Sequence, residues 1–462
     1  MTKSVLIYFI LTLFLACKSI KNYDLIITNA KVLNIKTGEI KNNQTILISN
    51  GYIEEIESSS NSFQGKQYID AKGQLVSPSF IDTHIHPTDI LGDYEKAPIT
   101  LNKDSLNHYR QKISNEYLPY GTTTVLTMGQ PEKWLTPLLE WQKRTNPNYI
   151  DFYISGGALI SKENRVPYIA HTEVVTAKKT KQKILQYYNL GIRHLKLYYR
   201  LKEPEFSVAV KTADSLKMKV YGHIGDFSPE YLTIKQTLKI GLTNYEHLAT
   251  IPNSVIISDV DKAKVYKQFK DNFGEINSES KLLDFFLEQY RFIDENKKPE
   301  IENLIKNLSD KKVTISTTIH RLYEQIAATY FTNKKDTTLT PKQLKRLTEN
   351  FAIMMKYAKI MQESGIKIRL GSDMPNGGKV NISELIILAK YGFNIIDIFR
   401  ISSYNGAEAI GIENQTGSIE KGKKADLILW SKNPFDNYEN FNSKIIIIKD
   451  GKVYKKMNAQ PD

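Results

Sequence analysis

The middle of the chain repeats one unit, an amphipathic helical segment followed by a short apolar strand. This alternation predicts parallel strands joined by helices, because the hydrophobic period switches repeatedly between that of a helix and that of a strand. Eight strands are predicted: one that leads into His84, and seven at 121–126, 149–154, 191–198, 219–223, 242–247, 313–317 and 366–373. Eight such units are typical of a (β/α)8 barrel, in which functional groups gather at the carboxyl ends of the strands.

Both ends of the chain differ from the middle, because they are rich in short apolar strands. Near the start, such strands are predicted at residues 24–33, 45–48 and 52–56. Near the end, they are predicted at 425–430 and 444–453. We therefore predict an α/β chain with two domains. A small β-sandwich domain would be built from both termini (22–77 plus 416–458), and a TIM-like barrel would span 78–415. Within the barrel, residues 253–312 form a charged helical insertion, either over the barrel mouth or as a surface bundle.

The first predicted strand carries a His-x-His pattern. In the stretch 77–87, apolar residues alternate with Asp82, His84 and His86, so the two imidazoles lie on one face and can bind one metal ion. The pair could equally be hydrogen-bonded core histidines, because a motif this short is often fortuitous. Further ligand-type residues, however, follow other apolar strands: Lys196, His223, His247 and Asp373. For Asp82 we expect a role as the hydrogen-bond partner of an imidazole.

The N-terminus indicates export. Residues 5–16 are almost wholly apolar but too short to span a bilayer comfortably, and Cys17, the only cysteine of the chain, follows directly. This resembles a bacterial lipoprotein signal (1–17) and predicts a protein anchored to a bacterial membrane through lipid on Cys17. An ordinary secretory signal or an uncleaved anchor are the alternatives. The formal net charge of +13 is spread along the chain without a long basic block, so nucleic acid is not an expected partner.

Together these motifs resemble the amidohydrolase superfamily, on the branch with imidazolonepropionase-like and prolidase-like enzymes. The C-terminal runs 405–411 and 417–427 are also typical of it. The resemblance implies that His84, His86 and Asp373 bind one metal, that His223 and His247 bind a second, and that Lys196 is carboxylated and bridges them. Two divalent ions are expected, with zinc as the metal. Two ions that share a water provide hydroxide near neutral pH and polarise a carbonyl, and Asp373 would act as general acid and base.

We therefore predict a hydrolase of an amide-type C–N bond in a small peptide-like or N-acyl substrate. A single-metal deaminase or cyclic-amide hydrolase, in which Lys196 is not a ligand, is the main alternative. A surface binding protein on the same scaffold is another. Substrate contacts are expected from four residues near the predicted strand ends, although each could instead be structural: His171, Tyr198, His320 and Arg321. Arg321 would bind a substrate carboxylate unless it forms a surface salt bridge. The sequence makes no prediction of the oligomeric state.

Overall fold

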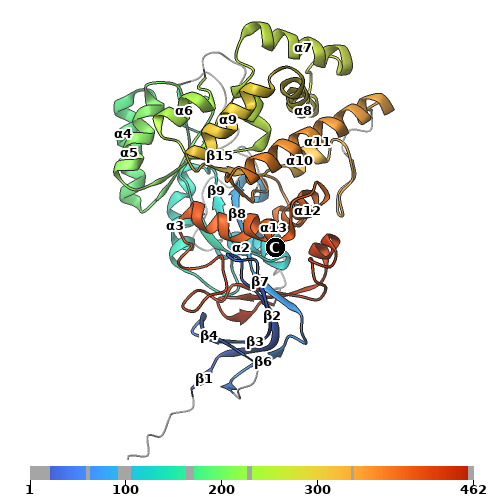
Figure 1. The fold of residues 1–462 in the computed structure, drawn as a ribbon. Helices are drawn as coiled ribbons and strands as arrows, with labels where there is room; N and C mark the ends of the chain where they lie inside the picture. The colour runs from blue at the N-terminus through green and yellow to red at the C-terminus, as the bar shows by residue number, and fades with distance from the viewer. Residues whose placement is uncertain are drawn as a thin grey trace, which may run out of the picture.

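The structure is a computed structural model, and it describes residues 21–58, 63–91, 106–162, 171–225, 231–334 and 338–455. The predicted signal (1–17), with Cys17, lies outside the described residues. A β-rich domain and an α/β barrel stack along the long axis of the molecule, and helices of the insertion cover the far end of the barrel (Figure 1). No helix within the described ranges is long and apolar enough to cross a membrane.

Parallel strands form the barrel, and their order follows the sequence. In order they are β8 (Phe80–Ile85), β9 (Thr122–Thr127), β10 (Asp151–Ile154) continued by β11 (Ala158–Ile160), β13 (His194–Leu197), β14 (Lys219–His223), β15 (Asn244–Glu246), β16 (Thr314–Ser316) and β17 (Lys367–Arg369). The backbone amide of Thr83 on β8 donates to the carbonyl of Leu370, which follows β17, at 2.9 Å. This bond closes the ring, and the predicted (β/α)8 fold is confirmed. A short strand, β12 (His171–Glu173), pairs alongside β11.

Helices surround the strands and pack on them with their apolar faces. The main ones are α2 (Leu106–Tyr117), α3 (Leu135–Lys143), α4 (Ala177–Leu190), α5 (Glu205–Ser215), α6 (Ile234–Ile240), α11 (Pro341–Glu363) and α12 (Gly377–Lys390), with short α1 (Thr88–Leu91), α10 (His320–Tyr323), α13 (Ile395–Phe399) and α14 (Asn405–Ile410). Local sequence sets their ends: Thr233 and Thr340 begin α6 and α11 with capping boxes. Gly191 ends α4 in the left-handed conformation that glycine favours.

The β domain is one eight-stranded sheet made from both ends of the chain. Its order is β20 (Lys452–Val453), β19 (Ile445–Lys449), β18 (Leu427–Trp430), β7 (Leu75–Pro78), β2 (Leu25–Leu33), β3 (Ile40–Ser49) and β4 (Tyr52–Ser58), with β6 (Tyr68–Asp70) also beside β2. β7 joins the two ends, because it pairs with β2 on one side and with β18 on the other. Two further short strands, β1 (Asn22–Tyr23) and β5 (Gln64–Gly65), pair with each other. The chain thus returns to its starting domain after completing the barrel.

Buried ion pairs link this sheet to the bottom of the barrel. Asp151 begins β10, and its Oδ2 lies 2.7 Å from Lys424 Nζ and 3.1 Å from Lys449 Nζ. The same Lys449 amine lies 2.9 Å from Asp450 and 3.5 Å from Asp426. Since Lys449 is fully buried, its ammonium group serves as the internal cation of three carboxylates. We call these five residues the interdomain ion cluster.

The insertion forms three helices between β15 and β16: α7 (Asp259–Phe273), α8 (Glu279–Asn296) and α9 (Lys298–Asp310). Several polar contacts hold α8 to the barrel, and two of them involve buried side chains near its middle. Its fully buried Glu288 contacts Arg346 of α11, with Arg346 Nη2 at 2.5 Å, and accepts a hydrogen bond from Asn350 at 2.7 Å. Tyr290 donates its hydroxyl to the carbonyl of Leu248 at 2.5 Å. The insertion is therefore held to the barrel by buried polar contacts as well as by apolar packing.

Candidate metal centre

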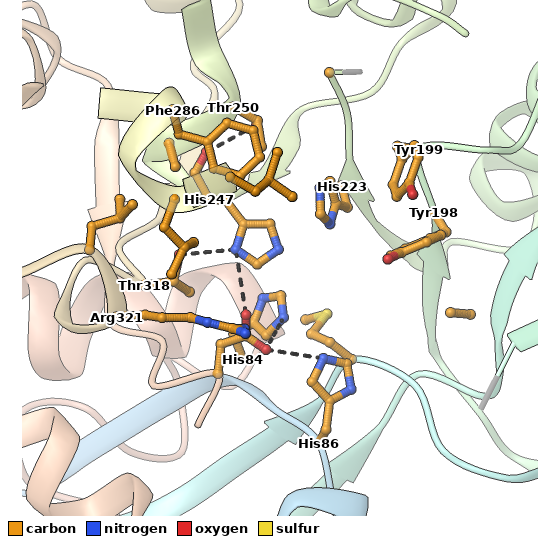
Figure 2. A pocket seen from close by; sticks show the side chains of 18 of the residues that line it. His84, His86, Tyr198, Tyr199, His223, His247, Thr250, Phe286, Thr318 and Arg321 are labelled. Carbon is orange, nitrogen blue, oxygen red and sulfur yellow. Dashed lines mark hydrogen bonds and ion pairs between the residues drawn. The ribbon is translucent and has the colours of Figure 1, made fainter. Parts of the chain in front are cut away.

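The six residues predicted as metal ligands meet at the carboxyl end of the barrel. His84 lies near the end of β8, and His86 directly follows that strand. Lys196 lies in β13, and His223 is the last residue of β14. His247 follows β15, and Asp373 follows β17. All six line one cavity of about 740 Å³, and the labelled imidazoles among them point into it (Figure 2). Because strands of a barrel converge in this way, residues far apart in sequence share one site.

Asp373 lies among the histidines. Its Oδ1 atom lies 3.2 Å from His86 Nε2 and 3.4 Å from His84 Nε2, and its Oδ2 atom lies 3.8 Å from His247 Nδ1. His84, His247 and Asp373 each offer one ligand atom, and these atoms lie within 4.8 Å of one another. His223 adjoins this group through His247, with ring centroids 4.4 Å apart. The arrangement provides nitrogen and oxygen donors around a common space.

Unusual backbone conformations place these side chains. His247, Thr318 and Asp373 have φ values of 67°, 50° and 50°, in the left-handed region that non-glycine residues rarely adopt. The backbone amide of Asp373 donates to the carbonyl of His84 at 2.9 Å, and Thr318 Oγ1 lies 2.9 Å from His247 Nδ1. Such conformations cost free energy and concentrate at functional sites, where surrounding contacts hold them.

Burial keeps two of the imidazoles neutral. It lowers the pKa of His223 to about 3, with Lys196 and His84 adding to the effect. Burial also lowers the pKa of His247 well below the usual range. For Asp373, burial alone would raise the pKa, but His84, His86 and His247 outweigh it and hold the pKa well below the usual range. Neutral imidazole and charged carboxylate are the forms that bind metal ions.

Lys196 is a buried lysine in the wall of the cavity. Its side chain is 1% exposed, and among the described residues its Nζ has no hydrogen-bond acceptor. Burial lowers the pKa of this amine to about 8, although Glu246 and Asp373 partly oppose the shift. An unpaired buried amine is costly in an ordinary core, so this position suits a lysine whose amine is neutral or chemically altered.

Two buried charges that the sequence analysis did not single out lie beneath the centre. Glu246, the last residue of β15, has its Oε2 atom 2.5 Å from His84 Nδ1 and accepts a hydrogen bond from Ser316 at 2.6 Å. Its other oxygen contacts the guanidinium of Arg369, which also donates to Thr83 Oγ1 at 2.7 Å. Burial alone would raise the pKa of Glu246, but Arg369, His84 and Lys196 hold it well below its usual range.

Charged Glu246 is acceptor-only, so Nδ1 of His84 carries the proton of their hydrogen bond. The Nε2 atom of His84 then points to the cavity as the ligand atom. Asp82, which we predicted to partner an imidazole, is bonded differently. Its carboxylate accepts from the backbone amides of His84 at 3.0 Å and Ser372 at 3.2 Å, and from Asn381 Nδ2 at 3.0 Å. That expectation was wrong: Asp82 fixes the backbone of β8, and Glu246 is the imidazole's partner.

The four predicted substrate residues fall in different places. Tyr198 and Arg321 line the cavity. His171 is not among the residues that line the cavity, and its ring packs on that of Tyr198 with centroids 4.4 Å apart. His320 is fully buried away from the cavity, with Nδ1 2.9 Å from Ser383 Oγ and Nε2 3.1 Å from Glu324 Oε1. The prediction for His320 is corrected, because α10 begins at this residue and turns its ring toward α12.

A divalent metal fits these residues. The donor set comprises imidazole nitrogens and a carboxylate that line one cavity, which suits zinc and similar ions. Two features favour a second ion: His223 adjoins the tight group of three donors through His247, and the Lys196 amine faces the same cavity without a hydrogen-bond partner among the described residues. A carbamate on Lys196 would supply the anionic bridge between two such ions.

A model described as the amidohydrolase family matches residues 75–457. The chain belongs to the amidohydrolase family. The resemblance inferred from the sequence is thereby confirmed, and with it membership of a metal-dependent hydrolase family. Among curated proteins, this amidohydrolase is 35% identical over 104 residues to the adenine deaminase of Listeria innocua, covering 22% of this chain and 14% of that enzyme. It is 24% identical over 232 residues to the adenine deaminase of Bacillus subtilis, covering 46% and 34% respectively.

These matches thus span well under two thirds of the curated relatives. Solved structures resemble the amidohydrolase over most of its length. A prolidase complexed with N-methylphosphonate-L-proline has a TM-score of 0.65 at 14% identity and covers 94% of this chain and 100% of its own. A Xaa-Pro dipeptidase with bound methionine has a TM-score of 0.62 at 18% identity, covering 93% of this chain and 99% of its own. At such identities the similarity establishes the fold.

Proposed function

We propose that the chain is a metal-dependent hydrolase of an amide bond in a peptide-like or N-acyl substrate. The observation that carries this proposal is that four histidines meet Asp373 and the buried Lys196 in one cavity, where the Lys196 amine has no hydrogen-bond partner among the described residues. The prolidase and dipeptidase among the structural neighbours support the choice of a peptide-like substrate. When bound, a pair of divalent ions would supply an activated water and polarise the substrate carbonyl.

Asp373 is the residue proposed to move the proton. Its carboxylate is 21% exposed to the cavity, and its lowered pKa leaves it charged and able to accept. It would take a proton from the attacking water and deliver it to the leaving nitrogen. The neighbouring histidine rings fix its position. The Asp373 carboxylate would then both accept and donate the proton. It would not need to rotate away between the two transfers.

Arg321 and Tyr198 are the proposed substrate contacts at the cavity wall. Among the described residues, Arg321 is the one arginine that lines the cavity. Its planar guanidinium group can bind a carboxylate through two parallel hydrogen bonds. Tyr198 packs edge-on to His223 with ring centroids 5.1 Å apart, so its ring borders the metal site. Together they would place the scissile amide between the metal ligands and the mouth of the cavity.

One experiment tests this function. Purified protein should contain two divalent metal ions per chain by elemental analysis and should cleave some member of a set of dipeptides, N-acyl amino acids and cyclic amides. Chelation should abolish turnover, and zinc should restore it. A protein that binds metal but cleaves none of these substrates would point to a binding protein on this scaffold.

A single-metal deaminase is the second candidate. Two observations favour it: the tightest donor group has only His84, His247 and Asp373, and the curated relatives include adenine deaminases. In that case Lys196 would not be a ligand. One metal per chain with ammonia released from adenine would support this candidate over the first.

We also infer that the enzyme works outside the cytoplasm, tethered through lipid on Cys17. This inference rests on the apolar run before that cysteine and on the polar residues that follow it. The barrel would then act at a membrane surface on substrates that reach that compartment.

A further inference from the structure

One face of α8 looks into the metal cavity. Glu279, Leu282, Leu283 and Phe286 all line it, and their spacing of i, i+3, i+4 and i+7 places them in one stripe along the helix. In the view of the cavity, Phe286 is drawn beside Thr250 and above His247 (Figure 2). The insertion therefore supplies a wall of the active cavity that the barrel strands do not provide.

The composition of this stripe is unusual for a helix that is not covered on that side. α8 already buries other apolar side chains, such as Phe285 and Leu287, against the core. Its cavity face nevertheless carries three more apolar residues, and Leu282 is 40% exposed. A solvated helix face normally carries polar residues, and apolar surface left in a pocket marks a place for an apolar ligand group.

The stripe begins with a charged contact. Glu279, in the first turn of α8, forms an ion pair with Arg321, whose side chain is 38% exposed. Leu282 and Leu283 follow one helical turn later. A carboxylate bound by Arg321 would thus lie one turn from the apolar part of the stripe. In an amino acid the carboxylate and the side chain share one carbon atom, so a residue held by Arg321 would direct its side chain along α8.

The wall is also rigid. Its C-terminal half is fastened through Glu288 to α11 and through Tyr290 to the carbonyl of Leu248, next to His247. A fixed wall close to a metal ligand selects ligands by size, because it does not move aside at low cost.

We propose that Leu282, Leu283 and Phe286 form a subsite for a large apolar side chain on the amino acid released from the substrate. Resting on the proposed function, this names the substrate class as N-acyl derivatives of amino acids with a free carboxylate and a side chain of leucine or phenylalanine size. Arg321 would exchange Glu279 for the substrate carboxylate when such a molecule binds.

The test compares metal-loaded full-length protein on N-acetyl derivatives of glycine, alanine, leucine and phenylalanine, and on their C-terminal amides. We expect kcat/KM to rise by roughly 10- to 100-fold from glycine to phenylalanine. This rise should shrink about tenfold in Phe286→Ala and disappear in Leu282→Glu. Leu282→Ala, at a partly exposed position, provides a variant that keeps its fold if Phe286→Ala does not. Val260→Ala, at an exposed apolar residue of α7 outside the cavity wall, is the control and should keep the full rise.

A second arm makes the outcome independent of turnover. N-ethyl derivatives of the same amino acids lack the scissile carbonyl, and their binding can be measured by calorimetry. Affinity that rises with side-chain size in the normal protein but not in Leu282→Glu supports the subsite, even if no amide is cleaved and the proposed hydrolase function fails. Affinity and kcat/KM that are indifferent to side-chain size, or that are higher for the C-terminal amides, overturn it.

Discussion

The Nδ1 atom of His84 lies 2.5 Å from the Oε2 atom of Glu246, so strands β8 and β15 are joined directly beneath the metal centre. Neither residue is more than 1% exposed, and Arg369 keeps the carboxylate charged. Because this bond sets the tautomer and the ring orientation of His84, Glu246 positions a proposed metal ligand and is not itself one of the proposed ligands.

Replacing Glu246 with Gln should therefore weaken metal binding by about 10- to 100-fold. The change also leaves the Arg369 charge unpaired, so the free energy of unfolding should fall as well. Competition with a chromogenic chelator measures the affinity, and thermal unfolding measures the stability. Glu300→Gln, at an exposed glutamate of α9, is the control.

The double variant Glu246→Gln/Arg369→Met separates the two effects. It should recover much of the lost stability while the affinity for zinc stays low. A double variant with normal zinc affinity would show that Glu246 acts only through folding.

Asp373→Asn keeps the size of the side chain but removes the proton acceptor. Turnover of any amide substrate should fall by at least ~100-fold, the scale of a lost general base. Thermal stability should change little, because the side chain faces the cavity and not the core. Near-normal turnover would rule out the proposed proton path.

Lys196→Ala tests the second metal. The variant should bind fewer than two metals per chain and lose most activity, because the bridging ligand is gone. Formate or propionate should restore part of the activity by occupying the vacated position. Retention of two metals and full turnover would favour the single-metal alternative.

Asp151→Asn tests the interdomain ion cluster. Burial alone would raise the pKa of Asp151, but Lys449 and Lys424 hold it below its usual range. A carboxylate with a lowered pKa stabilises the fold above its unfolded pKa of about 4, and this stabilisation is lost as the pH falls further. At pH 7 the variant should lose on the order of 3 kcal/mol in the free energy of unfolding.

The difference in the free energy of unfolding between the unaltered protein and Asp151→Asn should narrow as the pH falls below about 4. Denaturant titrations at several pH values measure this difference. Asp271→Asn removes an exposed partner of Lys267 and should cost less than about 1 kcal/mol. A pH-independent difference for Asp151→Asn would mean that its charge is not what matters.

Cys17→Ser tests the proposed location in the native host. The variant should leave the membrane fraction or remain unprocessed, whereas the unaltered protein should carry lipid on its first mature residue. Recovery of the unaltered protein from the cytoplasm with Met1 retained would contradict the proposal.

The barrel was predictable because each strand is a short apolar run, and the ligand-type residues stand at the ends of these runs. Glu246 escaped notice for a local reason. In a regular strand, neighbouring side chains point to opposite faces, so Glu246 next to His247 should face outward. The left-handed backbone of His247 breaks that alternation and lets both side chains face inward.

Two other positions depend on contacts that a single sequence does not show. Arg369 resides inside the barrel only because Glu246, distant in sequence, neutralises it. His320 follows an apolar strand as the proposed ligands do, but a helix begins there and rotates its ring into the core. In both cases the decisive partner lies on another element, so periodicity and spacing carry no signal of it.

The hydrogen bond from Tyr290 to the carbonyl of Leu248 has a consequence for how such enzymes diversify. Insertions between barrel strands are usually regarded as exchangeable parts that alter specificity and spare the chemistry. Here the insertion is bonded to the turn that presents His247, so a transplanted loop without a donor at that point would disturb this proposed metal ligand. If both proposals hold, specificity and reactivity are inherited together in this chain.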